Sequence, residues 1–140
     1  MPACGDVAPP EELYNTTFTD AQHAPPNVVS DVTWSIYYDD PNGDTKKTAC
    51  SHLAGRYPHF KDFPHPPYIG SVKGGLIPCL TCVKLKNTKP PYRTIHITII
   101  NSAAAGYEIS KEAFNALNGG PGTKLQAEPS VADPSNCHPR

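Results

Sequence analysis

The spacing of the cysteines constrains the fold of this chain more than any other feature. Of five cysteines, Cys50, Cys79, Cys82 and Cys137 fall in the part that reads as folded, whereas Cys4 lies in a Pro-rich stretch. A zinc ribbon needs two close pairs, and only Cys79 and Cys82 form one. A thioredoxin-type redox pair should precede a helix, whereas Cys82 leads into an alternating, strand-like segment. Structural disulfides are the better interpretation, and three pairings stay open.

Disulfides and prolines together predict a small secreted domain. Two structural bridges would each stabilise the fold by roughly 3.5 to 4 kcal/mol, and such bridges persist in oxidising compartments. The chain has 17 prolines, more than twice the usual share, and proline interrupts helices and central strands. We therefore expect ordered loops around a compact sheet in one domain. Cys4 would be a free thiol, an intermolecular link or a remnant of cloning.

Charge and hydropathy exclude two classes of partner. The net charge is −1 and no basic cluster exceeds Lys46-Lys47, so nucleic acid is not an expected partner. The longest apolar run, residues 97–100, is far shorter than the roughly 20 residues of a membrane-spanning helix. Residues 1–6 contain neither a basic stretch nor an apolar segment, so no signal peptide is expected there.

The chain divides into an arm and a domain. Residues 1–30 contain two Pro-Pro pairs and no sustained periodicity, which predicts an extended or disordered arm. This arm carries the single N-x-S/T sequon, which makes Asn15 a glycosylation candidate. Residues 31–140 hold the periodic segments and are expected to form the folded domain.

Hydrophobic periodicity predicts a mainly β domain with one or two short helices. Alternating apolar residues predict strands at 32–38, 83–86, 93–100 and 125–127. Ser110 is a suitable N-cap for a short helix whose apolar face would be Ala113, Phe114 and Leu117, and Gly119-Gly120 would end it. Residues 57–70 and the segment from Gly106 to the helix read as loops. The pattern suggests a small closed barrel or a sandwich.

Several motifs, taken together, resemble one protein family. They are the segment 32–39 (VTWSIYYD), Thr48-Ala49-Cys50-Ser51, Phe63-Pro64 with Tyr68-Ile69-Gly70, the Cys79/Cys82 pair, Ile100-Asn101-Ser102-Ala103, Gly106-Tyr107-Glu108-Ile109 and Cys137. In order and spacing, over residues 31–137, these motifs are similar to those of the cerato-platanins, small secreted fungal proteins.

The resemblance implies a fold, a disulfide pairing and a function. The fold would be the double-ψ β-barrel shared with expansins, and the bridges would be Cys50–Cys79 and Cys82–Cys137. The function would be non-catalytic: binding of chitin-type or other cell-wall oligosaccharides, expansin-like wall loosening, and elicitation of plant defence through host receptors. Self-assembly at surfaces is a further implied property.

The resemblance also suggests which residues bind carbohydrate. Sugar rings present apolar faces and hydroxyl edges, so a binding groove needs aromatic and small polar groups. The expected residues are Tyr38, Asp39, Ser51, Arg56, Asn101, Gly106, Tyr107 and Glu108. Most aromatics, however, are more simply explained as core. The chain departs from the family pattern with Asn101 in place of an aspartate, Ser102 in place of a histidine, Ser35 in place of an aspartate and Trp34 in place of a tyrosine.

Enzyme and metal functions are not expected. Glycoside hydrolysis needs two carboxylates flanking the scissile bond, and Asn101 stands at the natural second position beside Asp39. An amide can still hydrogen-bond sugar hydroxyls. His52, His59 and His65 lie in a Pro-rich region without a shared face, so no metal or cofactor is expected. The alternatives to sugar binding are a self-assembling interface protein or a weak hydrolase of the expansin and small-endoglucanase type.

Overall fold

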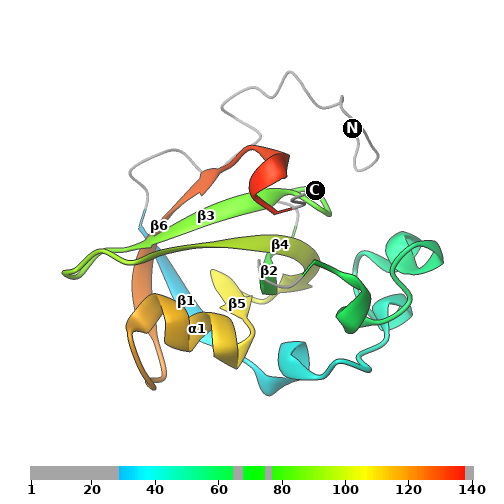
Figure 1. Ribbon diagram of the computed structural model, residues 1–140, viewed down its shortest axis with the longest axis horizontal. Coiled ribbons are helices and arrows are strands. Elements are labelled where there is room, and N and C mark those ends of the chain that lie inside the picture. Colours follow the sequence, from blue (N-terminus) through cyan, green and yellow to red (C-terminus); the bar gives the residue numbers. More distant parts are fainter. Residues whose placement is uncertain (1–28, 65–67, 75–76, 138–140) are drawn as a thin grey trace.

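Six β-strands close into a barrel in the order β1-β5-β2-β4-β3-β6 (Figure 1). The computed structural model describes residues 29–64, 68–74 and 77–137. Residues 1–28 of the predicted arm, which include Cys4 and Asn15, lie outside the described residues. His65 lies outside them as well. The strands are β1 (Ser30–Trp34), β2 (Tyr68–Lys73), β3 (Cys82–Asn87), β4 (Thr94–Ala103), β5 (Tyr107–Ile109) and β6 (Leu125–Val131).

The barrel mixes parallel and antiparallel pairing. β1 pairs with β5, and β2 with β4, in parallel, whereas the remaining neighbours are antiparallel. Parallel neighbours require long connections: the chain from β2 to β4 passes through β3, and the chain from β1 to β5 begins with a series of 3-10 segments. The predicted class, a mainly β barrel with a short helix and two disulfides, is confirmed. No helix among the described residues has the length and apolar character needed to cross a membrane.

The strands and one helix share the main core. α1 (Lys111–Asn118) begins as predicted: the Ser110 Oγ accepts a hydrogen bond from the Ala113 N–H at 3.1 Å. It ends at Gly119, whose φ of 78° is the left-handed conformation that glycine adopts readily. The buried face of α1, centred on Phe114, packs against apolar residues of β3, β4 and β6. In β4, which confirms the strand predicted at 93–100, Ile95, Ile97 and Ile99 are buried.

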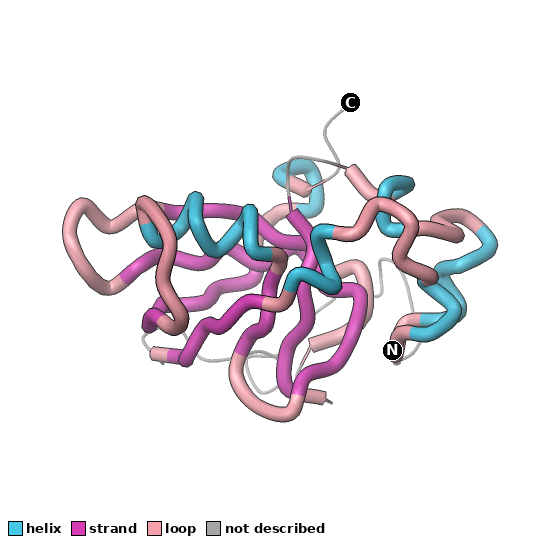
Figure 2. The backbone as a smooth tube through the Cα atoms, turned by 90° about the horizontal axis from the view of Figure 1, so that it is seen from below, coloured by secondary structure: helices cyan, strands magenta, loops and turns pink. Residues whose placement is uncertain are grey.

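A second region, the lobe (residues 36–64), lies on one side of the barrel (Figures 1 and 2). It consists of 3-10 segments: η2 (Ile36–Asp39), η3 (Thr45–Lys47), η4 (Ser51–Gly55) and η5 (Phe60–Asp62). A small core of its own, formed by Tyr38, Phe60 and Phe63, packs on Ile69 and Ile100 of the barrel. The lobe is thus held by aromatic packing rather than by a regular hydrogen-bond ladder.

Two disulfides connect these parts. Cys50 of the lobe is bonded to Cys79, with a Cα–Cα distance of 5.9 Å. Cys82 at the start of β3 is bonded to Cys137, with a Cα–Cα distance of 5.6 Å. The pairing implied by the family resemblance is therefore confirmed. A further 3-10 turn, η6 (Pro134–Asn136), directly precedes Cys137.

One predicted strand is too long. The prediction at 32–38 is right for β1 but wrong beyond Trp34, since residues from Ile36 onward form η2. The strand stops where its partner β5 stops, because Trp34 is in register with Ile109. The Ser35 Oγ then accepts a hydrogen bond from the Tyr37 N–H at 3.2 Å, which turns the chain into the 3-10 segment.

Two predicted loops contain strands. The segment 57–70 ends in the first residues of β2, and the segment after Gly106 forms β5. Neither strand has a local partner: β2 pairs with β4 and β5, and β5 also pairs with β1. Short strands whose partners are distant in sequence leave a weak local pattern, which is why both were read as loops.

Candidate functional site

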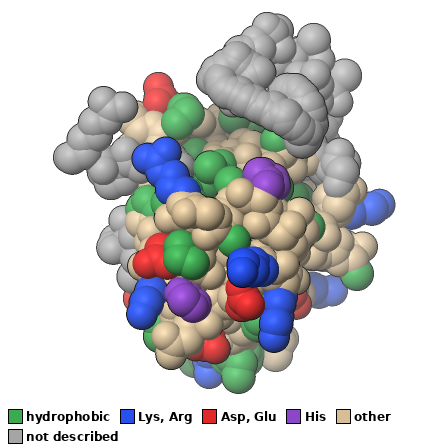
Figure 3. Space-filling model, turned by 90° about the vertical axis from the view of Figure 1, so that its right-hand side faces the viewer, with side chains coloured by type: hydrophobic (Ala, Val, Ile, Leu, Met, Phe, Trp, Pro, Cys, Tyr) green, Lys and Arg blue, Asp and Glu red, His purple; other side chains and the backbone are tan. Residues whose placement is uncertain are grey.

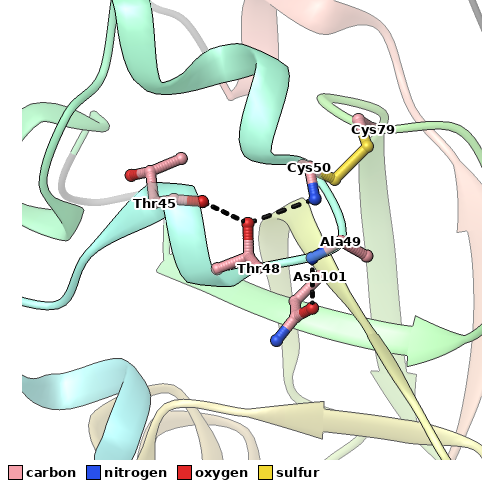
Figure 4. The surroundings of a disulfide bond; sticks show 6 residues. All are labelled: Thr45, Thr48, Ala49, Cys50, Cys79 and Asn101. Carbon is pink, nitrogen blue, oxygen red and sulfur yellow. Dashed lines mark hydrogen bonds between the residues drawn. A yellow bond between two sulfur atoms is a disulfide. The ribbon is translucent and has the colours of Figure 1, made fainter.

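Asn101 joins the lobe to the barrel. Its Oδ1 accepts a hydrogen bond from the Ala49 N–H at 2.8 Å, and its Nδ2 donates to the Tyr38 hydroxyl at 3.1 Å. Next to it, the Thr48 Oγ1 accepts from the Cys50 N–H at 3.1 Å, just before the disulfide (Figure 4). The amide of Asn101 therefore holds the segment that leads to Cys50 against β4. The hydrogen bonds of Asn101 therefore give it a structural role.

Three polar residues lie in register across neighbouring strands beneath Tyr38. Ser71 of β2 is opposite Asn101 of β4 on one side and opposite Glu108 of β5 on the other. The Ser71 hydroxyl donates to the Glu108 carbonyl oxygen at 2.9 Å. Burial raises the pKa of Tyr38, an effect that hydrogen bonds with Ser71 and Asn101 partly offset. We call Asn101, Ser71 and Glu108 the polar row.

Asp39 caps the helix. Its two carboxylate oxygens accept hydrogen bonds from the N–H groups of Lys111, at 2.7 Å, and Glu112, at 3.0 Å. With the Ser110 side chain on Ala113, three N–H groups of the first turn have side-chain acceptors. A carboxylate at this end also interacts favourably with the helix dipole. Asp39 thus fixes the position of η2 against α1, and both its oxygens are engaged.

A shallow depression of about 240 Å³ lies where η2, η5 and the start of α1 meet. Its floor consists of buried residues: Tyr38, Phe60, Ile69 and Ser110. Its rim consists of exposed residues: Asp39, Asp40, Pro41, Lys61 and Glu112, with Pro64 half-buried beside them. Two of the eight predicted binding residues, Tyr38 and Asp39, line it. The polar row meets this depression at Tyr38.

The depression combines an aromatic floor with charged groups at its edge. The ring centroids of Tyr38 and Phe60 are 6.1 Å apart and nearly parallel, with 24° between the ring planes. On the rim, the exposed Asp40 side chain accepts a hydrogen bond through its Oδ1 from the Asn42 N–H at 2.9 Å. The Lys61 side chain adds a cation. Small ligands with an apolar face and polar edges fit such a lining.

Ser51 and Arg56 lie on the exposed surface of the lobe, outside this lining. Ser51 is the first residue of η4, and Arg56 is its C-cap. The Arg56 guanidinium lies 5.6 Å from the centre of the Tyr57 ring, so it is placed over an aromatic side chain rather than over the depression. The structure does not bring these two predicted residues together with Tyr38.

Gly106 and Tyr107 have structural roles. Gly106 has a φ of 56°, and a Cβ there would collide with the Asp31 carbonyl oxygen, so only glycine fits. Tyr107 is 3% exposed and belongs to the barrel core. Its hydroxyl has no hydrogen-bond partner among the described residues, and burial raises its pKa. The expectation that Tyr107 lies in a surface loop is wrong, because alternation along β5 turns its ring inward.

Sequence reasoning missed some residues of the polar row and of the depression. Ser71 of the polar row escaped notice because the predicted loop 57–70 covered the first residues of β2, so no strand was expected there. Asp40, Lys61 and Glu112 carry no local signal, since only folding brings them to one rim. No group of three or more metal-ligating side chains gathers within residues 29–64, 68–74 and 77–137.

A family model described as Cerato-platanin matches residues 30–139 of the chain. The chain belongs to the cerato-platanin family. Cerato-platanins are secreted fungal proteins and are generally non-catalytic, which fits the expectation that this member is not an enzyme.

Individual relatives agree with this assignment. The chain is 30% identical over 117 residues to allergen Asp f 15 of Aspergillus fumigatus, covering 76% of this chain and 75% of the allergen. Cerato-platanin 2 of M. perniciosa has the same fold, with a TM-score of 0.70 and 24% identity over 79% of this chain and 98% of that one. The solution structure of the fungal elicitor Cerato-Platanin matches with a TM-score of 0.65 and 24% identity, over 76% of this chain and 95% of that one.

Proposed function

We propose that this cerato-platanin binds cell-wall oligosaccharides, of the chitin type or related glucans, in the depression between the lobe and α1. The observation that carries the proposal is the aromatic and aliphatic floor of Tyr38, Phe60 and Ile69 beneath a rim of charged side chains. A sugar ring presents an apolar face to such a floor and hydroxyls to such a rim. A shallow site suits reversible binding of a polymer, which cannot be enclosed.

The binding is non-catalytic in this proposal. A glycosidase needs two carboxylates at a suitable separation, one of them a proton donor. Asn101 cannot replace such a group, and its amide already binds Ala49 and Tyr38. Both oxygens of Asp39 already accept hydrogen bonds from the helix backbone, so neither is free to act on a glycosidic bond.

Expansin-like loosening of the wall and elicitation of plant defence are the proposed consequences of this binding. A protein that competes for contacts between polysaccharide chains can loosen a wall without breaking covalent bonds. The similar Cerato-Platanin is described as a fungal elicitor, and this supports the proposal that host receptors recognise the present chain after secretion. Asp40 and Lys61 are exposed and would also be accessible to such a receptor.

Isothermal titration with N-acetylglucosamine oligomers tests the site. We expect the Asp40→Ala/Lys61→Met variant to bind at least about fivefold more weakly than the wild type, the loss expected for one or two exposed hydrogen bonds. The matched control is Lys47→Met, which removes a lobe cation outside the depression. Equal affinities in all three proteins, or no heat at millimolar ligand, would overturn the assignment. Release of reducing sugar during long incubation would overturn the non-catalytic part.

A second candidate function is self-assembly at interfaces. The observation that favours it is a pair of adjacent exposed apolar residues on η2: Ile36 is 66% exposed and Tyr37 is 39% exposed. Light scattering over a range of concentrations tests it. Ile36→Ser should reduce the higher-order species, and Cys4→Ser should do so if a thiol links the copies. Monomeric behaviour at every concentration contradicts this candidate.

A further inference from the structure

The outer surface of β3 and its neighbours is basic and takes no part in the proposed sugar site. Between Asp62 and Glu108 the chain has no acidic residue but five basic ones: Lys73, Lys84, Lys86, Lys89 and Arg93. Of these, Lys84 and Lys86 lie on β3, whereas the Arg93 guanidinium lies beside Gly119 at the end of α1. In β3, buried and exposed residues alternate, so Lys84 and Lys86 point outward together. The core that includes α1 lies on the other side of these strands.

Strand register gathers polar partners around these two lysines. Lys84 is opposite His96 on β4 and Ser130 on β6. Lys86 is opposite Thr94 on β4 and Glu128 on β6. We call this surface the basic face; it comprises Lys84, Lys86, Thr94, His96 and Ser130, with Glu128 as its acidic member and Tyr92 at its hairpin end.

The cations of the basic face are not neutralised. Within the described residues, neither Lys84 nor Lys86 forms an ion pair, although Glu128 is the cross-strand neighbour of Lys86. Burial and the positive charge of Lys84 lower the pKa of His96, the neighbour of Lys84 on β4. Such a surface attracts anions.

Tyr92 adds an aromatic surface to the edge of the face. It is 52% exposed, and the Lys86 Nζ lies 5.8 Å from the centre of its ring. Its φ of 62° lies in the left-handed region, which is rare for a bulky residue. The hairpin holds it there through a hydrogen bond from the Tyr92 N–H to the Lys89 carbonyl oxygen at 2.8 Å. Residues held in such sparsely populated backbone conformations cluster at functional sites.

The lobe has a different charge distribution. Lys and Arg side chains there alternate with Asp and Glu side chains on the face shown in Figure 3. The acidic residues of the lobe are Asp39, Asp40, Asp44 and Asp62, and its basic residues are Lys46, Lys47, Arg56 and Lys61. The basic face, with two lysines and one glutamate, therefore has an excess of positive charge that the lobe, with four acidic and four basic residues, lacks.

We propose that the basic face binds an acidic polysaccharide, a chain bearing uronate carboxylates, along β3 and β4 with a sugar ring against Tyr92. Each carboxylate is matched by an ammonium group of Lys84 or Lys86, and the Thr94 hydroxyl supplies a hydrogen-bonding group. The face is as extended as the strands that form it, which suits a linear polymer. A bilayer would need several apolar side chains to insert, and the face exposes one aromatic residue.

Titration with de-esterified polygalacturonate tests this proposal. The same polymer in fully methyl-esterified form is the uncharged control ligand. Lys84→Gln/Lys86→Gln should weaken binding about tenfold, as expected for two exposed ion pairs. Glu128→Gln should strengthen it about twofold, because it removes the one carboxylate that faces the ligand. Lys46→Gln/Lys47→Gln changes the net charge equally on the lobe and should leave binding unchanged.

The outcomes separate this surface from the depression. Binding of the charged polymer that falls with added NaCl, and that follows these variants, supports the proposal even if chitin oligomers do not bind. Equal weakening by the two double-lysine variants overturns it, because it would then reflect net charge alone. Equal binding of the esterified polymer also overturns it. So does Lys84-dependent binding to phosphatidylserine vesicles when polygalacturonate gives no signal.

Discussion

The barrel and the lobe are built on different principles. The barrel closes all its strand edges and buries aliphatic side chains together with α1. The lobe has no strand, and within it the Tyr57 and Phe63 rings stack 4.6 Å apart while 3-10 turns carry the backbone. Hydrogen-bond ladders and a large core give cooperative stability, whereas a small aromatic cluster needs attachment to something stable. The lobe is attached through Asn101 and the Cys50–Cys79 bridge.

This contrast matters for function because the two proposed binding surfaces lie on different regions. The depression includes lobe residues, so its shape depends on how firmly the lobe is attached. The basic face consists of barrel residues alone. Changes that loosen the lobe should therefore affect the depression and spare the basic face.

Removal of a core aromatic ring should have the largest effect. Phe114 is 0% exposed in the barrel and Phe60 is 4% exposed in the lobe. We expect Phe114→Ala to lower the free energy of unfolding by about 3 to 5 kcal/mol in urea titrations. Phe60→Ala should lower it less and should instead expose residues 36–64 to protease. If both variants lost the same global stability, the lobe would be an integral part of the barrel's cooperative unit.

Removal of each disulfide compares the same two regions. With sequence separations of 29 for Cys50–Cys79 and 55 for Cys82–Cys137, loop entropy predicts losses of about 3.6 and about 4.2 kcal/mol. Cys82→Ser/Cys137→Ser should shift the global urea midpoint. Cys50→Ser/Cys79→Ser should chiefly increase hydrogen exchange in the lobe. An unchanged exchange rate there would show that aromatic packing alone is sufficient.

Substitution of Asn101 tests the junction itself. Asn101→Ala leaves the Ala49 N–H without its partner and removes one of the two side-chain partners of the Tyr38 hydroxyl, so we expect a loss of about 1 to 2 kcal/mol. Asn101→Asp keeps an acceptor for the Ala49 N–H and can accept from the Tyr38 hydroxyl, so its loss should be smaller. Denaturation of both variants in parallel measures the difference. Equal losses would mean that the amide nitrogen, rather than the acceptor, maintains the junction.

The smallest effect concerns the pH dependence of the barrel. The pKa of His96 is lowered by burial and by Lys84, so below the ordinary value of about 6.5 the unfolded chain binds more protons. Stability should therefore fall as the pH drops through 6.5 towards the folded-state pKa. His96→Gln should reduce this dependence of the free energy of unfolding on pH by a few tenths of a kcal/mol per pH unit, a small effect because solvent screens the half-exposed ring.

An NMR titration of the His96 ring sharpens this comparison. Lys84→Gln should raise the pKa of His96 because it removes a nearby positive charge. Lys46→Gln/Lys47→Gln on the lobe should leave it unchanged. A shift of the same size in both variants would contradict a local effect on the basic face.

Local patterns predicted the elements that carry their own signals. α1 has a capping serine at Ser110, an apolar face and a terminal glycine, and each of these acts within a few residues. β3 and β4 alternate strongly and are joined by a short hairpin, so they too were predictable. The four cysteines indicated disulfides, but their spacing left the pairing open.

The features that depend on contacts between residues far apart in the sequence could be assigned only from the tertiary structure. β2 and β5 exist because the closed barrel supplies neighbours for them, and η2 forms because β5 ends at Ile109. The depression likewise joins Asp40, Lys61 and Glu112 from three separate segments. Tyr107 is another example: the sequence shows an aromatic residue there, but its burial in the core follows from the pairing of β5 with β2. Short-range propensity is encoded in neighbouring residues, whereas the position of a side chain relative to a site is set by contacts that form only when the chain closes on itself.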